Sequence, residues 1–326
     1  MAAADGWWNR LCEVSSYRED ARRTDEFYDI EADSYDAFFS DPVEDMQLIR
    51  ALAKDTGGPI LEIMSGTGRL LLPLAREGYE VWGLDVNEAM LNRAKAKLSE
   101  ESVETQARVH LCEGDARSFR LGRKFPFIVV TFGSLLHLQE EKDREACLRN
   151  ALEHLDSGGL FFVAIPNWST KPLGPYVRLA STTRVLWSAA LAHVRTWPPM
   201  QLARLFAGTL GTWLLRHPGG RITWIKAVPI GPGAQVVRVV FTIVDSDKRT
   251  MTKEVRYEVL GRRGPRARRV ARLSLAVISR KEMESSLDHC GFSIVKMMGG
   301  FRGEPFGNDS EVQVYLCRRR GEEATP

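Results

Sequence analysis

Short apolar runs alternate with helical segments between residues 58 and 168. The runs that predict buried strands are 59–64, 80–85, 108–112, 126–132 and 159–165, and the segments with helical spacing are 69–77, 87–99 and 141–155. This alternation indicates βαβ units, which form a parallel sheet covered by helices on both faces. Ligands of such sheets bind outside the carboxyl ends of the strands, so a site is expected in the loops that follow the strands.

The pattern changes on both sides of this region. Residues 1–57 have helical spacing and predict an N-terminal helical cap. Residues 169–233 are basic and apolar, and we interpret them as a helical insert. Residues 234–278 alternate with period two, which indicates an antiparallel β insert.

The main sheet resumes after these inserts. Ser279 predicts a capped helix that ends at Gly291, and strands are expected near 292–297 and 311–317. The sequence therefore predicts an α/β protein with a doubly wound, Rossmann-like seven-stranded sheet, an N-terminal helical lid, and an inserted helical plus antiparallel β accessory region. The predicted parts are the helical cap 1–57, the Rossmann-like domain 58–168 and 279–320, the helical insert 169–233, the antiparallel insert 234–278 and the tail 321–326.

Composition describes an ordinary globular protein. The 326 residues are 44% hydrophobic and 27% charged, and the formal net charge of +3 is too small to indicate a nucleic-acid partner. The five cysteines are widely spaced without a CxxC pair, so neither a disulfide framework nor a metal site is expected. The sequence contains no secretory signal and no apolar run of about 18 residues. We therefore expect a soluble, cytoplasmic protein.

A turn of small residues, Met64-Ser-Gly-Thr-Gly68, separates the first predicted strand from the helix that follows it. Gly66 and Gly68 have no side chain, which lets backbone N–H groups approach a ligand closely. Dinucleotide-binding turns carry a third glycine where this chain has Leu71, and no Walker lysine follows. The turn is therefore more typical of another adenosine ligand.

Acidic residues lie at the ends of three neighbouring strands. Glu62 precedes the turn, Asp85 ends the second strand, and Asp115 follows the third. A carboxylate at a strand end can accept hydrogen bonds from two ribose hydroxyls, and one after the next strand can accept from an adenine amino group. The apolar side chains of Val86 and Met90 would cover the adenine faces.

These motifs resemble the class I S-adenosylmethionine-dependent methyltransferases. The glycine motif of that family is similar to Glu62–Gly68, and its later acids are similar to Asp85 and Asp115-Ala116. Met64 occupies the first glycine position, which predicts either an ordinary φ angle there or an altered methionyl pocket. The resemblance implies S-adenosylmethionine as cofactor and S-adenosylhomocysteine as product. The cofactor-binding residues are then Tyr28, Glu62, Met64, Ser65, Gly66, Thr67, Gly68, Asp85, Val86, Met90, Asp115, Ala116, Phe132 and Gly133.

A closer resemblance is to small-molecule methyltransferases that include the amino-sugar N,N-dimethyltransferases. Their N-terminal Tyr-Asp helix and their motif after strand four are similar to Tyr28-Asp29, Tyr35-Asp36 and Phe132–Leu138. Tyr35, His137 and Trp168 are the candidate substrate contacts. His137 is the candidate catalytic base because its unperturbed pKa of ~6.5 suits proton acceptance, and a packed or adenosine-contacting histidine is an equal alternative.

The basic insert departs from the amino-sugar pattern. No acidic residue occurs between Asp156 and Asp245, a stretch with nine Lys or Arg residues. Three hypotheses remain open: a lid over an apolar or anionic substrate, a homodimer contact, and a surface in 169–230 that touches anionic lipid. The lid is favoured over a solvated loop because aromatic residues are interleaved with the basic ones.

We predict an enzyme that transfers a methyl group from S-adenosylmethionine to N, C or O of a small molecule, such as a natural-product intermediate. One alternative is a cofactor-dependent cyclase or decarboxylase that does not methylate. A nucleic-acid methyltransferase is disfavoured because the loop after the fourth strand lacks an Asn-Pro-Pro-Tyr tetrad, so no nucleic-acid partner is expected. A non-enzymatic binding or membrane-associated protein is the third alternative.

Overall fold

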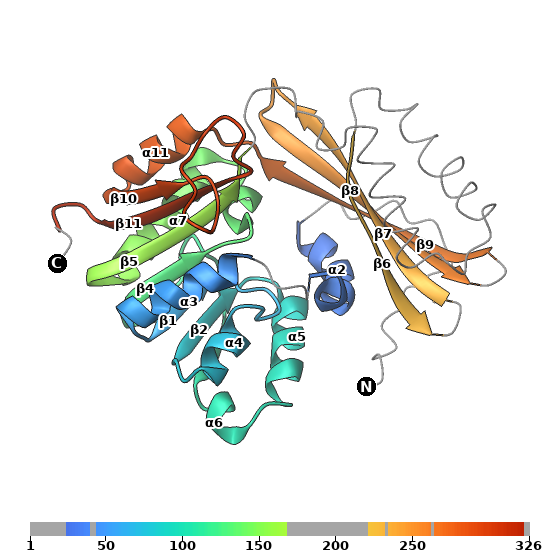
Figure 1. The fold of residues 1–326 in the computed structure, drawn as a ribbon, viewed down its shortest axis with the longest axis horizontal. Coiled ribbons are helices and arrows are strands. Elements are labelled where there is room, and N and C mark those ends of the chain that lie inside the picture. The colour runs from blue at the N-terminus through green and yellow to red at the C-terminus, as the bar shows by residue number, and fades with distance from the viewer. Residues whose placement is uncertain (1–23, 40–43, 168–220, 232–233, 262–263, 323–326) are drawn as a thin grey trace. The chain divides into compact units, whose positions relative to one another are not determined.

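The structure, a computed structural model, describes residues 24–39, 44–167, 221–231, 234–261 and 264–322. The chain divides into two compact units, which are described separately (Figure 1). The α/β unit consists of Phe39–Lys171 and Ala276–Pro326, and the antiparallel unit of Met1–Phe38 and Pro172–Leu275.

The α/β unit contains a seven-stranded sheet in the order β10-β11-β5-β4-β1-β2-β3. Strands β1 to β5 are parallel to one another, and β11 runs antiparallel to both β5 and β10. The strands are β1 (Ile60–Ile63), β2 (Val81–Asp85), β3 (Val109–Glu113), β4 (Phe125–Val130), β5 (Leu155–Pro166), β10 (Phe292–Met298) and β11 (Val312–Arg319). The predicted doubly wound seven-stranded sheet is confirmed.

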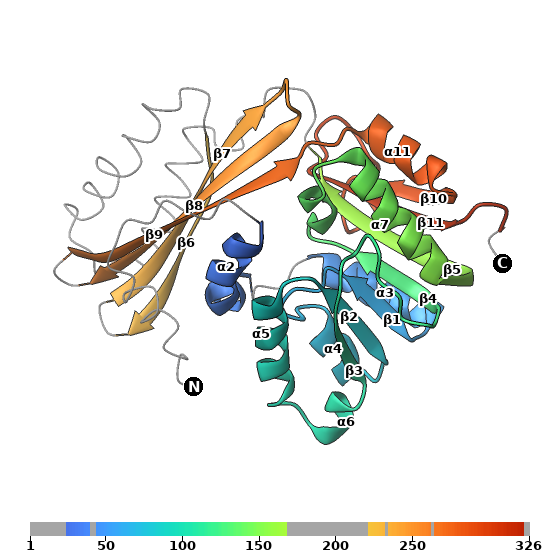
Figure 2. The ribbon, with the colours of Figure 1, turned by 180° about the vertical axis from the view of Figure 1, so that it is seen from behind.

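Helices cover both faces of this sheet. In Figure 1, α3 is turned toward the viewer, whereas α7 comes to the front in Figure 2. The helices are α3 (Glu44–Thr56), α4 (Leu71–Arg76), α5 (Glu88–Leu98), α6 (Val103–Gln106), α7 (Glu141–His154), α11 (Arg280–His289) and the 3₁₀ helix η1 (Ser134–His137). The predicted cap of α11 is present, because Ser279 and Glu282 form a reciprocal capping box.

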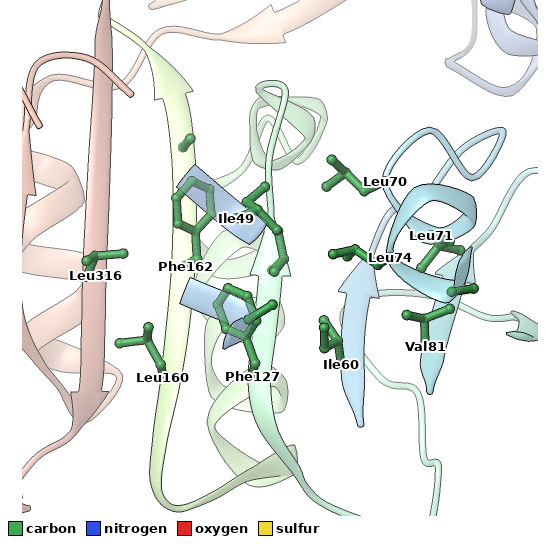
Figure 3. Packing of buried hydrophobic residues seen from close by; sticks show 14 of the residues in the cluster. Ile49, Ile60, Leu70, Leu71, Leu74, Val81, Phe127, Leu160, Phe162 and Leu316 are labelled. Atoms are coloured by element: carbon green, nitrogen blue, oxygen red, sulfur yellow. The ribbon is translucent and has the colours of Figure 1, made fainter. Parts of the chain in front are cut away.

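The core of the α/β unit lies between its central strands and the helices α3 and α4. Figure 3 shows Ile60, Phe127 and Phe162 on the adjacent strands β1, β4 and β5, and Ile49 from α3 packs in the same cluster. Burying each such side chain stabilises the fold by about 1.5–3 kcal/mol. Strands that are buried on both faces read as continuous apolar runs, which is why the sequence located them well.

Strand order reverses between β1 and β4. The chain proceeds from β1 to β2 and β3 on one side, and from β4 to β5 on the other. The loops after β1 and β4 therefore diverge at their carboxyl ends, and this switch point is where open α/β sheets bind their ligands.

The antiparallel unit contains α2 (Thr24–Phe39) and a four-stranded sheet in the order β6-β7-β8-β9. These strands are β6 (Arg221–Gly231), β7 (Ala234–Asp245), β8 (Thr250–Gly261) and β9 (Gly264–Ala276). The predicted antiparallel insert is thus confirmed, but it begins earlier than expected. Residues 221–231 form β6 although they were assigned to the helical insert: the segment is rich in β-branched and aromatic residues, which favour a strand, and it pairs with β7.

A buried ion pair fastens α2 to this sheet. The Arg238 guanidinium on β7 donates to the Glu31 carboxylate on α2 at 2.9 Å, and the Tyr257 hydroxyl on β8 donates to the same carboxylate. Arg238 belongs to the acid-free stretch of the sequence, so its acidic partner comes from 207 residues away. Phe38 adds a ring contact with Tyr257 at 5.8 Å between centroids.

Within the described part of the chain, no helix is both long enough and apolar enough to span a membrane. Among the same residues, no group of three or more His, Cys, Asp or Glu side chains could hold a metal ion. The hypotheses for 169–220 concern a segment outside the described residues, and the predicted domain boundaries stay predictions.

Candidate active site

The turn after β1 is built from left-handed backbone. Gly66 and Gly68 have φ angles of 55° and 73°, which glycine adopts without steric cost. Met64 also has a positive φ, 62°. Of the two alternatives for Met64, the ordinary φ is therefore wrong, and the altered methionyl pocket stays a prediction. Methionine adopts the conformation that a glycine would, at a cost of about 1–2 kcal/mol.

Asp85, at the end of β2, connects this turn to the next loop. Its Oδ2 accepts a hydrogen bond from the Gly66 N–H at 2.7 Å, and its Oδ1 accepts from the Asn87 N–H at 2.9 Å. Burial raises the pKa of Asp85, and these backbone hydrogen bonds oppose the shift. Each carboxylate oxygen has a second lone pair, so the group can still accept from a ligand.

Glu62 lies on β1 directly below the turn and is 6% exposed. Its Oε2, like the Ser65 hydroxyl, is buried without a hydrogen-bond partner among the described residues. Burial raises the pKa of Glu62 to about 8, and Arg69 is the main opposing charge. Buried polar atoms are rarely left unpaired in native proteins, which marks this position as one prepared for a ligand.

The loop after β3 carries Asp115 and Ala116. Asp115 is held by Arg117, whose Nη2 donates to Oδ2 at 2.5 Å, and this pairing lowers the pKa of Asp115. The carbonyl of buried Ala116 accepts from the Asn150 side chain on α7 at 3.3 Å. The loop is therefore fixed from both sides, with an ionised carboxylate available at its start.

Apolar side chains flank these polar groups. Val86, next to the half-buried Asp85, is 58% exposed. Met90 is buried under the turn, since a Cβ on Gly66 would lie 3.3 Å from its Cε. An exposed apolar surface beside hydrogen-bonding carboxylates suits a flat aromatic base.

The loop after β4 also has left-handed backbone. Phe132 and Gly133 have φ angles of 59° and 76°, and Phe132 is 42% exposed. They lead into η1, which ends with the half-buried His137. The predicted motif after the fourth strand thus lies at the switch point.

The structure brings most of the predicted site residues to one edge of the sheet in the α/β unit. Glu62 and the turn, Asp85, Asp115 and Phe132 all lie at or beyond the carboxyl ends of β1 to β4. Tyr28 and Tyr35 lie on α2 in the antiparallel unit, and Trp168 lies outside the described residues. The roles assigned to these three aromatic residues stay predictions.

Sequence reasoning missed several residues that shape this edge. Gly83 on β2 faces the turn so closely that a Cβ there would lie 2.2 Å from Leu71 Cδ1 and 2.9 Å from Ser65 Oγ. A glycine inside a strand pattern was the available signal. Asp45 on α3 accepts from Arg69 and Thr131, and no local pattern marks such a contact between distant segments.

The part of the chain that forms this edge of the sheet is similar to a known protein family. Residues 60–159, which include β1 to β4 and the beginning of β5, match the family model described as a methyltransferase domain. This segment is therefore similar to methyltransferase domains. The predicted resemblance to methyltransferases is confirmed for the part of the chain that carries the candidate site.

The chain is also similar to individual curated proteins. Over 145 residues the chain is 31% identical to the dTDP-3-amino-3,4,6-trideoxy-alpha-D-glucopyranose N,N-dimethyltransferase of Streptomyces venezuelae, covering 42% of this chain and 57% of the relative. The chain spans about half the length of the curated relatives it matches.

Solved structures share the fold over most of the chain. The CcbJ methyltransferase from Streptomyces caelestis has a TM-score of 0.63 at 20% identity, covering 90% of this chain and 98% of that one. The amino pentose methyltransferase CalS10 from Micromonospora echinaspora, solved with bound S-adenosylmethionine, has a TM-score of 0.57 at 18% identity, covering 87% and 96%. At these sequence identities the similarity shows a shared fold alone.

Proposed function

We propose that this protein is an S-adenosylmethionine-dependent methyltransferase that methylates an amino group of a small molecule, with amino sugars as the first class to test. The assignment of this cofactor rests on the arrangement of Glu62 and Asp85 around the Gly66–Gly68 turn at the switch point. The acceptor class is supported by curated relatives named as N,N-dimethyltransferases of dTDP-amino sugars.

Each part of the cofactor has a suitable group at this edge. Asp85 would accept hydrogen bonds from the ribose hydroxyls, and Asp115 from the adenine amino group. The exposed face of Val86 would cover the adenine ring. The buried carboxyl of Glu62, with its unpartnered Oε2, would face the methionyl ammonium group.

The bound cofactor supplies an electrophilic methyl carbon on a sulfonium. The chain has to hold an acceptor amine in line with that carbon and to exclude water, because much of the acceleration in such a transfer comes from orientation. In such a transfer the amine nitrogen would form the new C–N bond as the C–S bond breaks, with S-adenosylhomocysteine as the leaving group. We assign His137 as the base that takes the proton released from the methylated nitrogen.

The amine assignment is tested with matched acceptors. Two dTDP-sugars that differ only in an amino or hydroxyl group at one carbon are incubated with the protein and methyl-labelled S-adenosylmethionine. Label is expected in the amino sugar alone. Label in the hydroxyl compound would overturn the nitrogen assignment, and release of S-adenosylhomocysteine without a labelled product would favour a non-methylating reaction.

The role of His137 has its own test. His137→Ala is expected to lower kcat while leaving the affinity for S-adenosylhomocysteine unchanged, and the remaining activity should rise with pH as the amine loses its proton in solution. A weaker affinity with unchanged kcat would instead identify His137 as an adenosine contact. Contacts with a membrane surface, and a homodimer, remain predictions.

A further inference from the structure

Asp45 is bonded to two of the loops at the candidate site. It lies on α3, is fully buried, and accepts hydrogen bonds from the two terminal nitrogens of Arg69 at 3.0 and 2.6 Å. The Thr131 hydroxyl donates to the same carboxylate at 3.1 Å. Arg69 follows the turn after β1, and Thr131 follows β4, so one buried side chain joins both loops of the switch point.

The contacts of Arg69 continue to Phe132. The Arg69 guanidinium carbon lies 4.9 Å from the centre of the Phe132 ring, and Phe39 meets the same ring edge-on at 5.5 Å between centroids. Phe132 has a positive φ, which is costly for an aromatic residue and persists only where the surroundings impose it. Arg69, held by Asp45, is part of those surroundings.

Arg69 also sets the charge around Glu62. Its positive charge favours the ionised form of Glu62, whereas Asp45 and Asp85 disfavour it and Lys97 favours it more weakly. Both terminal nitrogens of Arg69 are engaged by Asp45. The Glu62 Oε2 has no hydrogen-bond partner among the described residues, although the charge of Arg69 influences this carboxyl.

We propose that Asp45 is a positioning residue of the cofactor pocket: it fixes the loops after β1 and β4 to each other and, by engaging Arg69, leaves Glu62 available to the cofactor's ammonium group. This inference rests on the proposed function. In Asp45→Asn the charge of Arg69 is no longer neutralised. The ionised form of Glu62 is then favoured and competes with the ligand by pairing with Arg69, and the loop after β4 loses a strong acceptor for Thr131.

The test compares variants by calorimetric titration with S-adenosylhomocysteine. Asp45→Asn is expected to weaken binding tenfold or more, and Thr131→Val, which removes one hydroxyl donor at nearly constant volume, by about threefold. The matched control is Arg50→Gln. Arg50 lies on the same helix and pairs at 2.6 Å with Glu77 at the end of α4, but this pair is exposed and touches neither loop. Its affinity should equal that of the unmodified protein.

Proton counting separates the positioning role from a general loss of stability. In two buffers of different ionisation enthalpy at pH 7, the unmodified protein should release close to one proton on binding, because Glu62 ionises when it meets the ammonium group. Asp45→Asn should release fewer protons, because removal of the Asp45 charge lowers the pKa of Glu62.

The outcomes of this experiment are distinct. If the unmodified protein binds the ligand and folded Asp45→Asn and Thr131→Val both match the Arg50→Gln control, the positioning role is overturned alone. If the unmodified protein does not bind S-adenosylhomocysteine, the proposed function fails, and the inference with it. If Asp45→Asn does not fold, Thr131→Val decides, and unchanged affinity in that variant overturns the inference.

Discussion

The backbone N–H of Gly66 donates a 2.7 Å hydrogen bond to the carboxylate of Asp85. These residues are 19 positions apart, and the bond joins the left-handed turn after β1 to the loop after β2. Asp85 therefore has two roles in this account, since it orders the turn and is the proposed acceptor for the ribose hydroxyls.

The two roles of Asp85 predict different effects for two substitutions. Asp85→Asn keeps the shape of the side chain and one acceptor oxygen, so it should keep the hydrogen bond from Gly66 that orders the turn and lose the one from Asn87. The affinity for S-adenosylhomocysteine should fall about tenfold to a hundredfold, as for the loss of a charged hydrogen-bonding partner. Asp85→Ala should also destabilise the fold. Binding and thermal unfolding measured together check this, with Glu88→Gln, an exposed acid in the first turn of α5, as control. Unchanged affinity in Asp85→Asn would contradict the ribose assignment.

The raised pKa of Glu62 predicts how the free energy of unfolding changes with pH in the absence of ligand. Its pKa is raised from 4.5 to about 8 in the folded protein. Between these values the unfolded chain gives up a proton that the folded chain keeps, so stability falls as pH rises, by up to roughly 1.4 kcal/mol per pH unit. This contribution is fully present below pH 4.5 and is lost once the pH exceeds about 8. Glu62→Gln lacks this dependence, so its advantage over the unmodified protein should grow from pH 5 to pH 8 in urea unfolding. Parallel stability profiles for the two proteins would show that Glu62 ionises freely in the fold.

The positive φ of Met64 predicts how substitutions at this position rank in stability. Because its φ is 62°, Met64→Gly relieves backbone strain while losing side-chain burial, and the free energy of unfolding should change by less than about 1 kcal/mol. Met64→Val places a β-branched residue in the same conformation and should cost about 1–2 kcal/mol. Denaturant unfolding ranks the two variants. A more stable Met64→Val than Met64→Gly would mean that the turn does not need a left-handed residue.

The buried pair of Glu31 and Arg238 predicts strong coupling in the antiparallel unit. Arg238→Met leaves the Glu31 carboxylate buried without its main cationic partner, which should cost about 3–5 kcal/mol. The double variant Glu31→Gln with Arg238→Met removes both charges and should be more stable than Arg238→Met alone. A double-mutant cycle followed by hydrogen exchange of the β7 amides measures this coupling, and additive effects would exclude it.

The sequence predicted those parts of the fold that depend on local patterns. The strands of the main sheet are continuous apolar runs, and acids at their carboxyl ends indicated where Glu62 and Asp85 would meet. Contacts between distant segments leave no such pattern, which is why the partners of Asp45 and Arg238 were missed. Met64 was misjudged for a related reason: the surrounding turn imposes a φ angle that its own preferences disfavour.

The central claim is that the edge formed by Glu62, the glycine turn and Asp85 binds S-adenosylmethionine. Titration of the purified protein with S-adenosylhomocysteine tests it most directly, because no acceptor has to be known. We predict one molecule bound per chain with a dissociation constant in the micromolar range or below, about −8 kcal/mol, and loss of this binding in Asp85→Ala. No binding by the folded, unmodified protein at millimolar ligand would contradict the account.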